Sequence, residues 1–359
     1  MKKILTVLLA VALLVTVAGC SGDVVILNQC DNCTAGNQAT PTEPQATEPV
    51  AQGSVKTGLA VITKVSDSAN ATSEEEGAAS FDVTVAAVTV DEKGVILSAV
   101  IDSVPATVGF TGIGELTTPV DTVISTKNEL GEGYGMVAWG GAIAEWDAQV
   151  AALCDFAVGK TVDELKNGAI DETGKAPQGS DLASSATIYL GGYVSALEQA
   201  VNNAKNLGAE GGDKLSLAIN SGIKSSTPAT EESAGNAQLD VSIAVVTSRE
   251  GVITSCIIDE LQAKVAFDVT GEILTDLNAP IATKNELGEN YGMVAWGNAI
   301  AEWNEQAAAF ASFVVGKTAA DVMGISVTET TKPADGTDLA SSVTIAIGGF
   351  QALIQKALG

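Results

Sequence analysis

The chain has 359 residues, enough for two ordinary domains, and 46% of them are hydrophobic, so substantial cores can be buried. Its 44 acidic and 18 basic side chains give a formal net charge of −26, which repels nucleic acid and anionic lipid headgroups and favours solubility. The sequence contains no histidine, which excludes Ser-His-Asp and Cys-His hydrolases and removes the usual ligand of zinc and haem. We therefore expect a cofactor to supply any chemistry.

The N-terminal residues have the pattern of an export signal. Lys2 and Lys3 precede an apolar run over 4–17 that is too short and wrongly flanked for a membrane-spanning helix. The small residues before Cys20 resemble a bacterial lipobox. The resemblance implies that residues 1–19 are a removed signal peptide and that the sulfur of Cys20 is lipidated, which anchors the chain on the extracytoplasmic face of the cell membrane. The alternative is an ordinary signal peptide with an incidental cysteine.

Residues 20–53 are interpreted as the lipidated cysteine followed by a tether. Residues 34–53 contain three prolines among Thr, Gln, Ala and Glu and almost no large apolar side chain, so this part cannot bury a core. Cys30 and Cys33 form a C-x-x-C pair, which can be a redox pair or half of a metal site. Because the sequence has no second C-x-x-C and no histidine to complete a zinc site, a local disulfide is favoured and no metal site is expected.

The rest of the chain is a tandem duplication. The string Thr-Lys-Asn-Glu-Leu-Gly-Glu-x-Tyr-Gly-Met-Val-Ala-Trp occupies residues 126–139 and returns at residues 283–296. Copies of this length indicate two domains rather than the short repeats of a solenoid, and we place them at residues 54–206 and 207–359.

Each repeat begins with signals for an antiparallel sheet. A first strand is predicted near 59–65, and a β-rich hairpin follows in which residues 81–90 and 95–101 flank a turn that ends in Gly94. The second repeat has the same pattern, with strands predicted near 215–219, 239–247 and 252–258.

Helical signals follow the strands. Apolar residues recur at helical spacing at Ile143, Trp146, Val150 and Leu153, and in the second repeat at Ile300, Trp303 and Ala307. A last helix is predicted at 193–204 and at 350–358. This order predicts an α+β fold of two tandem homologous domains, each a small antiparallel sheet with helices packed on it. Two cysteines inside the repeats, Cys154 and Cys256, stand at non-equivalent positions and are interpreted as buried small hydrophobes.

A hydroxyl-rich string carries the strongest functional signal. Asp181-Leu-Ala-Ser-Ser-Ala-Thr187-Ile in the first repeat returns as Asp338-Leu-Ala-Ser-Ser-Val-Thr344-Ile in the second. One interpretation is a helix cap and turn, because Ser, Thr and Asp oxygens satisfy free backbone N–H groups. That interpretation does not explain why two copies keep so similar a string while other loops have drifted.

The string resembles the flavinylation motif of FMN-binding domains, Asp-x-x-Ser-Gly/Ser-Ala-Thr, in which an FMN transferase joins FMN to the threonine hydroxyl through a phosphodiester bond. The resemblance implies an FMN-binding-domain-like fold and two covalent FMN groups, with Thr187 and Thr344 as acceptors. Ser185 and Ser342 stand where glycine is commoner, and Val343 replaces alanine. The other motif positions are Asp181, Asp338, Ser184 and Ser341.

The whole chain resembles a narrower group, the two-domain flavinylated lipoproteins of extracellular electron transfer in Gram-positive bacteria. The resemblance rests on the lipobox, the Thr/Pro tether and the two paired blocks, and it covers most of the mature chain. It implies an electron carrier that is matured by an FMN transferase. Electrons would come from a membrane quinol-linked donor and pass to extracellular acceptors such as ferric iron.

Aromatic and thioether groups of the repeated Tyr-Gly-Met-Val-Ala-Trp block are candidate contacts of the flavin rings, because such groups pack against a flavin face. These candidates are Tyr134, Met136, Trp139, Tyr291, Met293 and Trp296. The alternative is core packing, because Trp139 and Trp146 lie two helical turns apart and would then share one buried stripe.

Three other functions stay open. The chain could be a flavin-dependent terminal reductase, with turnover on one organic acceptor. It could be a solute- or cation-binding surface lipoprotein without a redox cofactor, or a structural surface repeat. The paired hydroxyl-rich strings favour the electron carrier over the last two.

Overall fold

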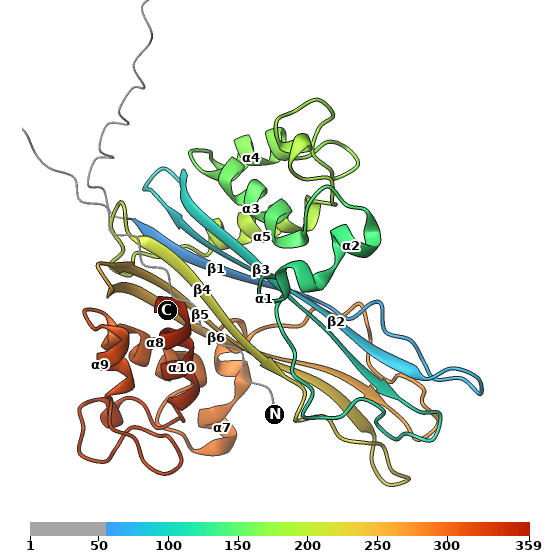
Figure 1. The fold of residues 1–359 in the computed structure, drawn as a ribbon. Helices are drawn as coiled ribbons and strands as arrows, with labels where there is room; N and C mark the ends of the chain where they lie inside the picture. Colours follow the sequence, from blue (N-terminus) through green and yellow to red (C-terminus); the bar gives the residue numbers. More distant parts are fainter. Residues whose placement is uncertain (1–54) are drawn as a thin grey trace, which may run out of the picture. The chain divides into compact units, whose positions relative to one another are not determined.

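A computed structural model describes residues 55–359 (Figure 1). The predicted signal peptide, the lipidated Cys20, the tether and the Cys30–Cys33 pair lie outside the described residues. Within 55–359, no helix is long and apolar enough to cross a membrane.

Each repeat has one three-stranded antiparallel sheet in which the strands follow chain order. The first sheet consists of β1 (Lys56–Lys64), β2 (Gly77–Val90) and β3 (Ile96–Phe110). The second consists of β4 (Lys214–Gly222), β5 (Gly235–Arg249) and β6 (Val252–Phe267). The predicted strands are all present, but the hairpin strands are longer than the sequence suggested. Both hairpins extend past the β-rich core of the pattern to a phenylalanine, Phe110 or Phe267.

The helices repeat in the same order. In the first repeat they are α1 (Lys127–Leu130), α2 (Met136–Gly140), α3 (Trp146–Ala157), α4 (Val162–Ala169) and α5 (Gly191–Asn202). In the second they are α6 (Lys284–Leu287), α7 (Met293–Gly297), α8 (Trp303–Val314), α9 (Ala319–Met323) and α10 (Gly348–Leu358). The prediction that Ile143 and Ile300 lie on the buried face of the long helix is wrong. Both side chains precede the helix and are more than half exposed, because Glu145 and Glu302 are the N-cap residues.

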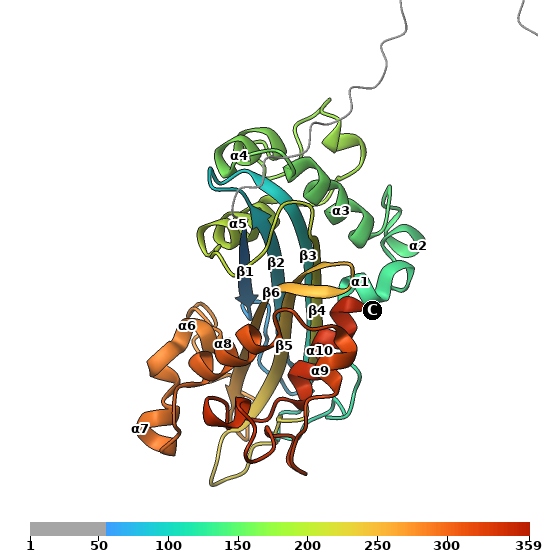
Figure 2. The same cartoon turned by 90° about the vertical axis from the view of Figure 1, so that its left-hand side faces the viewer.

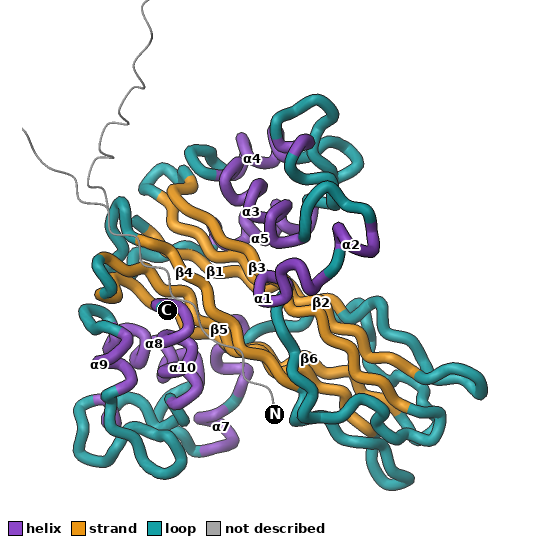
Figure 3. Tube along the Cα trace, viewed as in Figure 1, coloured by secondary structure: helices purple, strands orange, loops and turns teal. Residues whose placement is uncertain are grey.

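The two sheets pack face to face, with helices on both outer faces (Figures 1 and 2). Alternate residues of β2 show the division: Val83 and Val85 join the core between the sheets, whereas Ala86 and Val88 pack under α3 and α5. The second sheet divides in the same way, with Ala244 and Val246 under α8 and α10. Figure 3 shows the strands lying between the two sets of helices. The α+β prediction is confirmed at this level.

Equivalent residues of the two repeats meet at the shared core. The rings of Phe110 and Phe267 stack with centroids 4.1 Å apart. The Ala71 N–H donates to the Gly271 carbonyl at 2.9 Å, and the Ala229 N–H donates to the Gly114 carbonyl at 2.8 Å. Paired reciprocal contacts of this kind define an isologous interface. The two repeats therefore face each other as the subunits of a two-fold dimer do, and they form one compact unit.

Candidate functional site

The hydroxyl-rich string forms a short turn that ends with Thr187 at the surface. A 3₁₀ turn over Leu182–Ser184 is closed by the Ser184 hydroxyl, which donates to the Asp181 carbonyl at 2.6 Å. Leu182 and Ala186 are buried beneath the turn, and Thr187 is exposed. The buried Leu182 and Ala186 fix the turn on the core, so that Thr187 faces solvent.

The second string is built alike. The Ser341 hydroxyl donates to the Asp338 carbonyl at 2.7 Å, and Leu339 and Val343 are buried. Val343 takes the buried place of Ala186, so its replacement of alanine leaves the acceptor Thr344 in position. Thr344 itself is half-buried.

In the interpretation of this string as a helix cap and turn, the cap is wrong, whereas the turn is present in both repeats. Asp181 and Asp338 make no side-chain cap to the 3₁₀ turns that follow them. Leu190 and Ile347, and not the threonines, are the N-cap residues of α5 and α10. The aspartates and Ser184, Ser185, Ser341 and Ser342 are all exposed. Helix capping therefore does not explain the string, and the turn that it forms is its remaining structural explanation.

Serine fits the motif's glycine position without strain. Ser185 has a φ of −117° and Ser342 a φ of −121°, both in the range that ordinary residues adopt. The two departures from glycine leave the turn geometry intact.

A buried glutamine that the sequence analysis missed holds each threonine. Gln149 of α3 has no exposed surface, and its Oε1 accepts from the Thr187 N–H at 2.8 Å and from the Thr187 hydroxyl at 3.3 Å. Its Nε2 donates to the Ala144 carbonyl at 2.8 Å, which fixes the amide. The signal in the sequence is an amide kept at the same place on the apolar face of the long helix in both repeats.

Gln306 of α8 makes the same contacts in the second repeat. Its Oε1 accepts from the Thr344 N–H at 2.7 Å and from the hydroxyl at 3.1 Å, and its Nε2 donates to the Ala301 carbonyl at 2.8 Å. In both repeats the hydroxyl proton points toward the buried amide, so the oxygen's lone pairs are free toward solvent.

A hollow of about 280 Å³ is lined by the residues that directly follow Thr187, which is not itself among the lining residues. The residues next in the chain, Ile188 and Tyr189, line it together with Tyr134 and Met136 of the predicted ring contacts. The remaining lining residues are Ile62, Lys64, Asp82, Thr84, Lys127, Trp146, Gly192 and Tyr193. The structure thus brings two of the predicted aromatic and thioether contacts and a lysine together with the chain that directly follows the acceptor threonine.

Lys127 is the buried cation of this hollow. Its Nζ lies 5.3 Å from the centre of the Tyr134 ring and 5.1 Å from that of Trp146. The Trp146 indole in turn donates to the Tyr193 hydroxyl at 2.8 Å. The sequence leaves two interpretations of Lys127 and its counterpart Lys284, a partner of the flavin phosphate or a surface charge, and the burial of both side chains contradicts the second.

Lys284 lies in the same setting in the second repeat. Its Nζ is 4.9 Å from the centres of both the Tyr291 and the Trp303 rings. Burial alone lowers the pKa of Lys284, but an ion pair with Glu260 outweighs burial and holds that pKa above its usual value.

Two buried aspartates set the position of the lysines. Asp102 accepts from the Asn128 N–H at 3.1 Å, and Asp259 accepts from the Asn285 N–H at 3.1 Å, so each anchors the short helix that carries a lysine. Burial raises the pKa of both carboxyls, that of Asp259 to about 7. These carboxyls were not predicted, since burial could not be inferred from their local pattern.

Trp139 and Trp296 do not share a stripe with the buried tryptophans. Their exposed fractions are 84% and 91%, whereas Trp146 and Trp303 are buried. The Trp139 ring lies over Gly135, where a Cβ atom would come within 2.5 Å of it. The core-packing alternative is wrong for these two residues, and neither tryptophan lines a hollow described above.

Cys154 and Cys256 are free and buried, as predicted. Burial raises the pKa of each thiol to about 12, so neither is a reactive thiolate. Among residues 55–359, no group of three or more His, Cys, Asp or Glu side chains could hold a metal ion.

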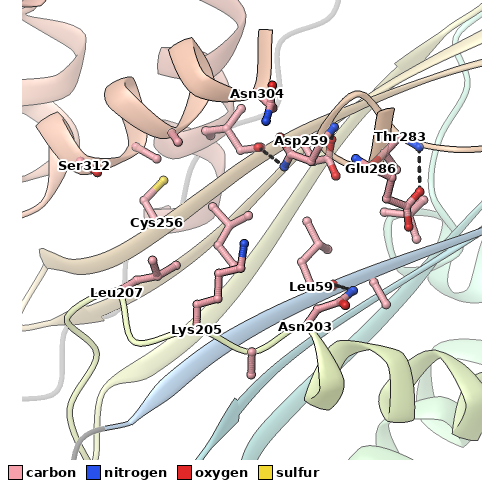
Figure 4. Close-up of a pocket in the computed structure, with 18 of the residues that line it drawn as sticks. Leu59, Asn203, Lys205, Leu207, Cys256, Asp259, Thr283, Glu286, Asn304 and Ser312 are labelled. Atoms are coloured by element: carbon pink, nitrogen blue, oxygen red, sulfur yellow. Dashed lines mark hydrogen bonds between the residues drawn. The ribbon is translucent and has the colours of Figure 1, made fainter. Parts of the chain in front are cut away.

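A larger cavity of about 880 Å³ lies between the repeats (Figure 4). Leu59 and Asn203 line it from the first repeat, and Cys256, Asp259 and Asn304 line it from the second. Neither acceptor threonine and neither buried lysine reaches this cavity. No protein-family model, curated protein or solved structure matches the chain.

Proposed function

We propose that the chain is an extracytoplasmic electron-transfer flavoprotein with one FMN joined through its phosphate to Thr187 and one to Thr344. The observation that carries the proposal is the repeated placement of a threonine hydroxyl, outside the core and held by a buried glutamine beside a lysine–aromatic cluster.

The glutamine is suited to an acceptor that loses its proton. Esterification replaces the hydroxyl proton by phosphorus, so the hydroxyl's bond to Gln149 is lost. The Thr187 N–H keeps its own bond to the same amide oxygen, and the Ile188 N–H donates to it as well at 3.2 Å. The backbone of the turn therefore stays fixed before and after attachment.

The hollow beside Thr187 suits a planar aromatic ring. Tyr134 and Met136 offer an aromatic face and a thioether, and Lys127 offers a fixed positive charge. The bound flavin would supply the exchange of electrons, and these residues would orient it and shield it from water.

The partners follow from this proposal. An FMN transferase would attach the flavins, a membrane quinol-linked donor would reduce them, and extracellular acceptors such as ferric iron would take the electrons. The lipid anchor at Cys20 would keep the protein beside its donor. The net charge of −26 attracts cationic acceptors rather than anionic ones.

The proposal is tested by the visible spectrum and in-gel fluorescence of denatured protein that has been co-expressed with an FMN transferase. Flavin should stay with the denatured chain, fall by half in Thr187→Ala and in Thr344→Ala, and be absent in the double variant. Thr330→Ala, which removes an exposed hydroxyl elsewhere, should keep all of it. Full flavin in the double variant would overturn the assignment of the acceptors.

The cavity between the repeats favours a second candidate, a solute-binding surface lipoprotein. Its volume of about 880 Å³ is within the range of ligand sites, and Asp259 and Glu286 line it. A protein that binds a small solute or cation while it carries no flavin after co-expression would support this candidate instead.

A further inference from the structure

The two lysine–aromatic clusters differ in one carboxylate. In the second repeat, Lys284 Nζ lies 2.5 Å from Glu260 Oε2 and forms a salt bridge with it. The residue at the matching place on β3 is Ser103, whose N–H donates to Asp102 as the Glu260 N–H donates to Asp259. The first cluster therefore lacks the carboxylate that pairs with the lysine in the second.

Lys127 has a longer and more exposed ion pair than Lys284. The nearest carboxylate oxygen belongs to Asp82, 4.0 Å from Lys127 Nζ, and that side chain is 51% exposed. Its equivalent in the second repeat is Asp240, so Glu260 is an added charge and not a relocated one. A water-exposed carboxylate at this separation is strongly screened.

The lysines themselves are closely matched. Their side chains are 9% and 10% exposed, and each lies over a tyrosine and a tryptophan. The comparison thus isolates the paired carboxylate from the burial of the cation. Other differences accompany it: Phe350 and Ala346 stand where the first repeat has Tyr193 and Tyr189, and Gly222 stands where the first repeat has Lys64, an exposed second cation that lines the first hollow.

We propose that Glu260 makes the cofactor at Thr344 harder to reduce than the cofactor at Thr187. This inference rests on the proposed function. Each electron added to a flavin ring adds negative charge until a proton follows, and a nearby ammonium group stabilises that charge. Lys127 keeps more of its charge, because Asp82 is farther away and more exposed, whereas Glu260 neutralises much of the charge of Lys284.

This difference in reduction potential between the two flavins gives electron transfer within the chain a direction. In a partly reduced molecule, electrons collect at Thr187 at equilibrium, and the site at Thr344 is the stronger reductant. Two repeats with the same attachment chemistry would thereby do different work.

The test compares proteins that hold a single flavin. Thr344→Ala retains the flavin at Thr187 and Thr187→Ala retains the flavin at Thr344, and spectroelectrochemical titration gives the midpoint potential of each. We expect the potential at Thr187 to be higher, by at least a tenfold change in the reduced-to-oxidised ratio, which is about 30 mV for a two-electron couple. Glu260→Gln should raise the potential at Thr344, and Ser103→Glu should lower the potential at Thr187.

Controls separate the charge pair from other effects. Glu231→Gln removes the same charge from an exposed turn and should leave the potential at Thr344 unchanged. In the flavin-free protein, NMR titration of the Lys284 Nζ group should show that Glu260→Gln lowers the pKa of Lys284.

The outcomes distinguish this inference from the proposed function. Two flavins of equal potential, or a potential at Thr344 that does not respond to Glu260→Gln, would overturn the inference and leave the proposed function standing. Loss of covalent flavin from the wild-type protein would overturn the proposed function, and the inference with it.

Discussion

Gln149 and Gln306 are the residues on which the candidate sites depend most directly. Each amide is buried and satisfies several groups at once, so its loss leaves backbone donors without partners. We expect Gln149→Leu to slow flavin attachment at Thr187 and to lower the free energy of unfolding by about 2–4 kcal/mol. Time-resolved mass spectrometry during attachment and urea unfolding measure the two effects.

Gln306→Leu is the matched control, since it should slow attachment at Thr344 and leave Thr187 unaffected. A Gln149→Leu protein that is destabilised but flavinylated at the normal rate would show that the glutamine has only a structural role.

Asp259 should make stability depend on pH. Its folded-state pKa is raised to about 7 from an ordinary value of 3.8, because burial penalises the charged carboxylate. The folded protein therefore holds a proton that the unfolded chain releases between about pH 4 and pH 7, and stability contributed by this group is lost as pH rises through that window.

Asp259→Asn should flatten this part of the pH profile, as measured by urea unfolding at a series of pH values. Asp171→Asn is the control, because that carboxyl is exposed and hydrogen bonds lower its pKa. Equal profiles for the wild type and Asp259→Asn would contradict the assignment.

At the scale of single elements, the two β-hairpins end in different turns. In the first, Asp91 Oδ1 accepts from the Lys93 and Val95 N–H groups at 2.8 Å, and Gly94 takes the left-handed conformation. The second turn is one residue shorter, and both Glu250 and Gly251 have positive φ, 52° and 79°. This is the conformation of a two-residue type I′ turn, in which glutamate is unfavourable.

Glu250→Asn should therefore raise the free energy of unfolding by about 0.5–1 kcal/mol, because asparagine tolerates the left-handed region. Lys93→Asn, at a position of the first turn with ordinary φ, should bring no gain. Chemical denaturation measures the free energy of unfolding of the two variants. Equal changes in this free energy would be inconsistent with the turn assignment.

Periodicity predicted the strands and the long helices because these elements alternate between one buried and one exposed face. It placed the start of the long helix too early, since Ile143 continues the apolar spacing without entering the helix. The same limit applies to the site. The string around Thr187 was visible as a repeat, but Gln149 approaches it from another element and could be recognised only in three dimensions, as could the burial of Lys127.

At the scale of the whole folded unit, the two repeats share one core, which the sequence could not show. Apolar and polar residues that alternate along a strand indicate that one face of the sheet is buried, but they do not indicate which element covers that face. Here the inner face of each sheet is covered by the sheet of the other repeat. We expect residues 55–206 expressed alone to form a symmetric dimer through this face, as measured by light scattering. A stable monomer would contradict the shared core.

The close contact between the repeats at Gly271 predicts a large loss of stability when this glycine is replaced. Gly271 has a φ of 73°, and a Cβ there would lie 2.5 Å from Ala71 Cβ of the other repeat. Gly251 has a similar φ of 79° but open space around it. Thermal or urea unfolding should show that Gly271→Ala costs about 1–3 kcal/mol more than Gly251→Ala, because only the former adds a clash to the backbone strain. Equal costs would mean that the contact is absent.

The most direct test of the central proposal is the intact mass of the mature protein after co-expression with an active FMN transferase. The proposed function predicts two FMN-sized additions in the wild type and none in the Thr187→Ala, Thr344→Ala double variant. A wild-type chain without either addition, while the transferase modifies another substrate in the same cells, would contradict it.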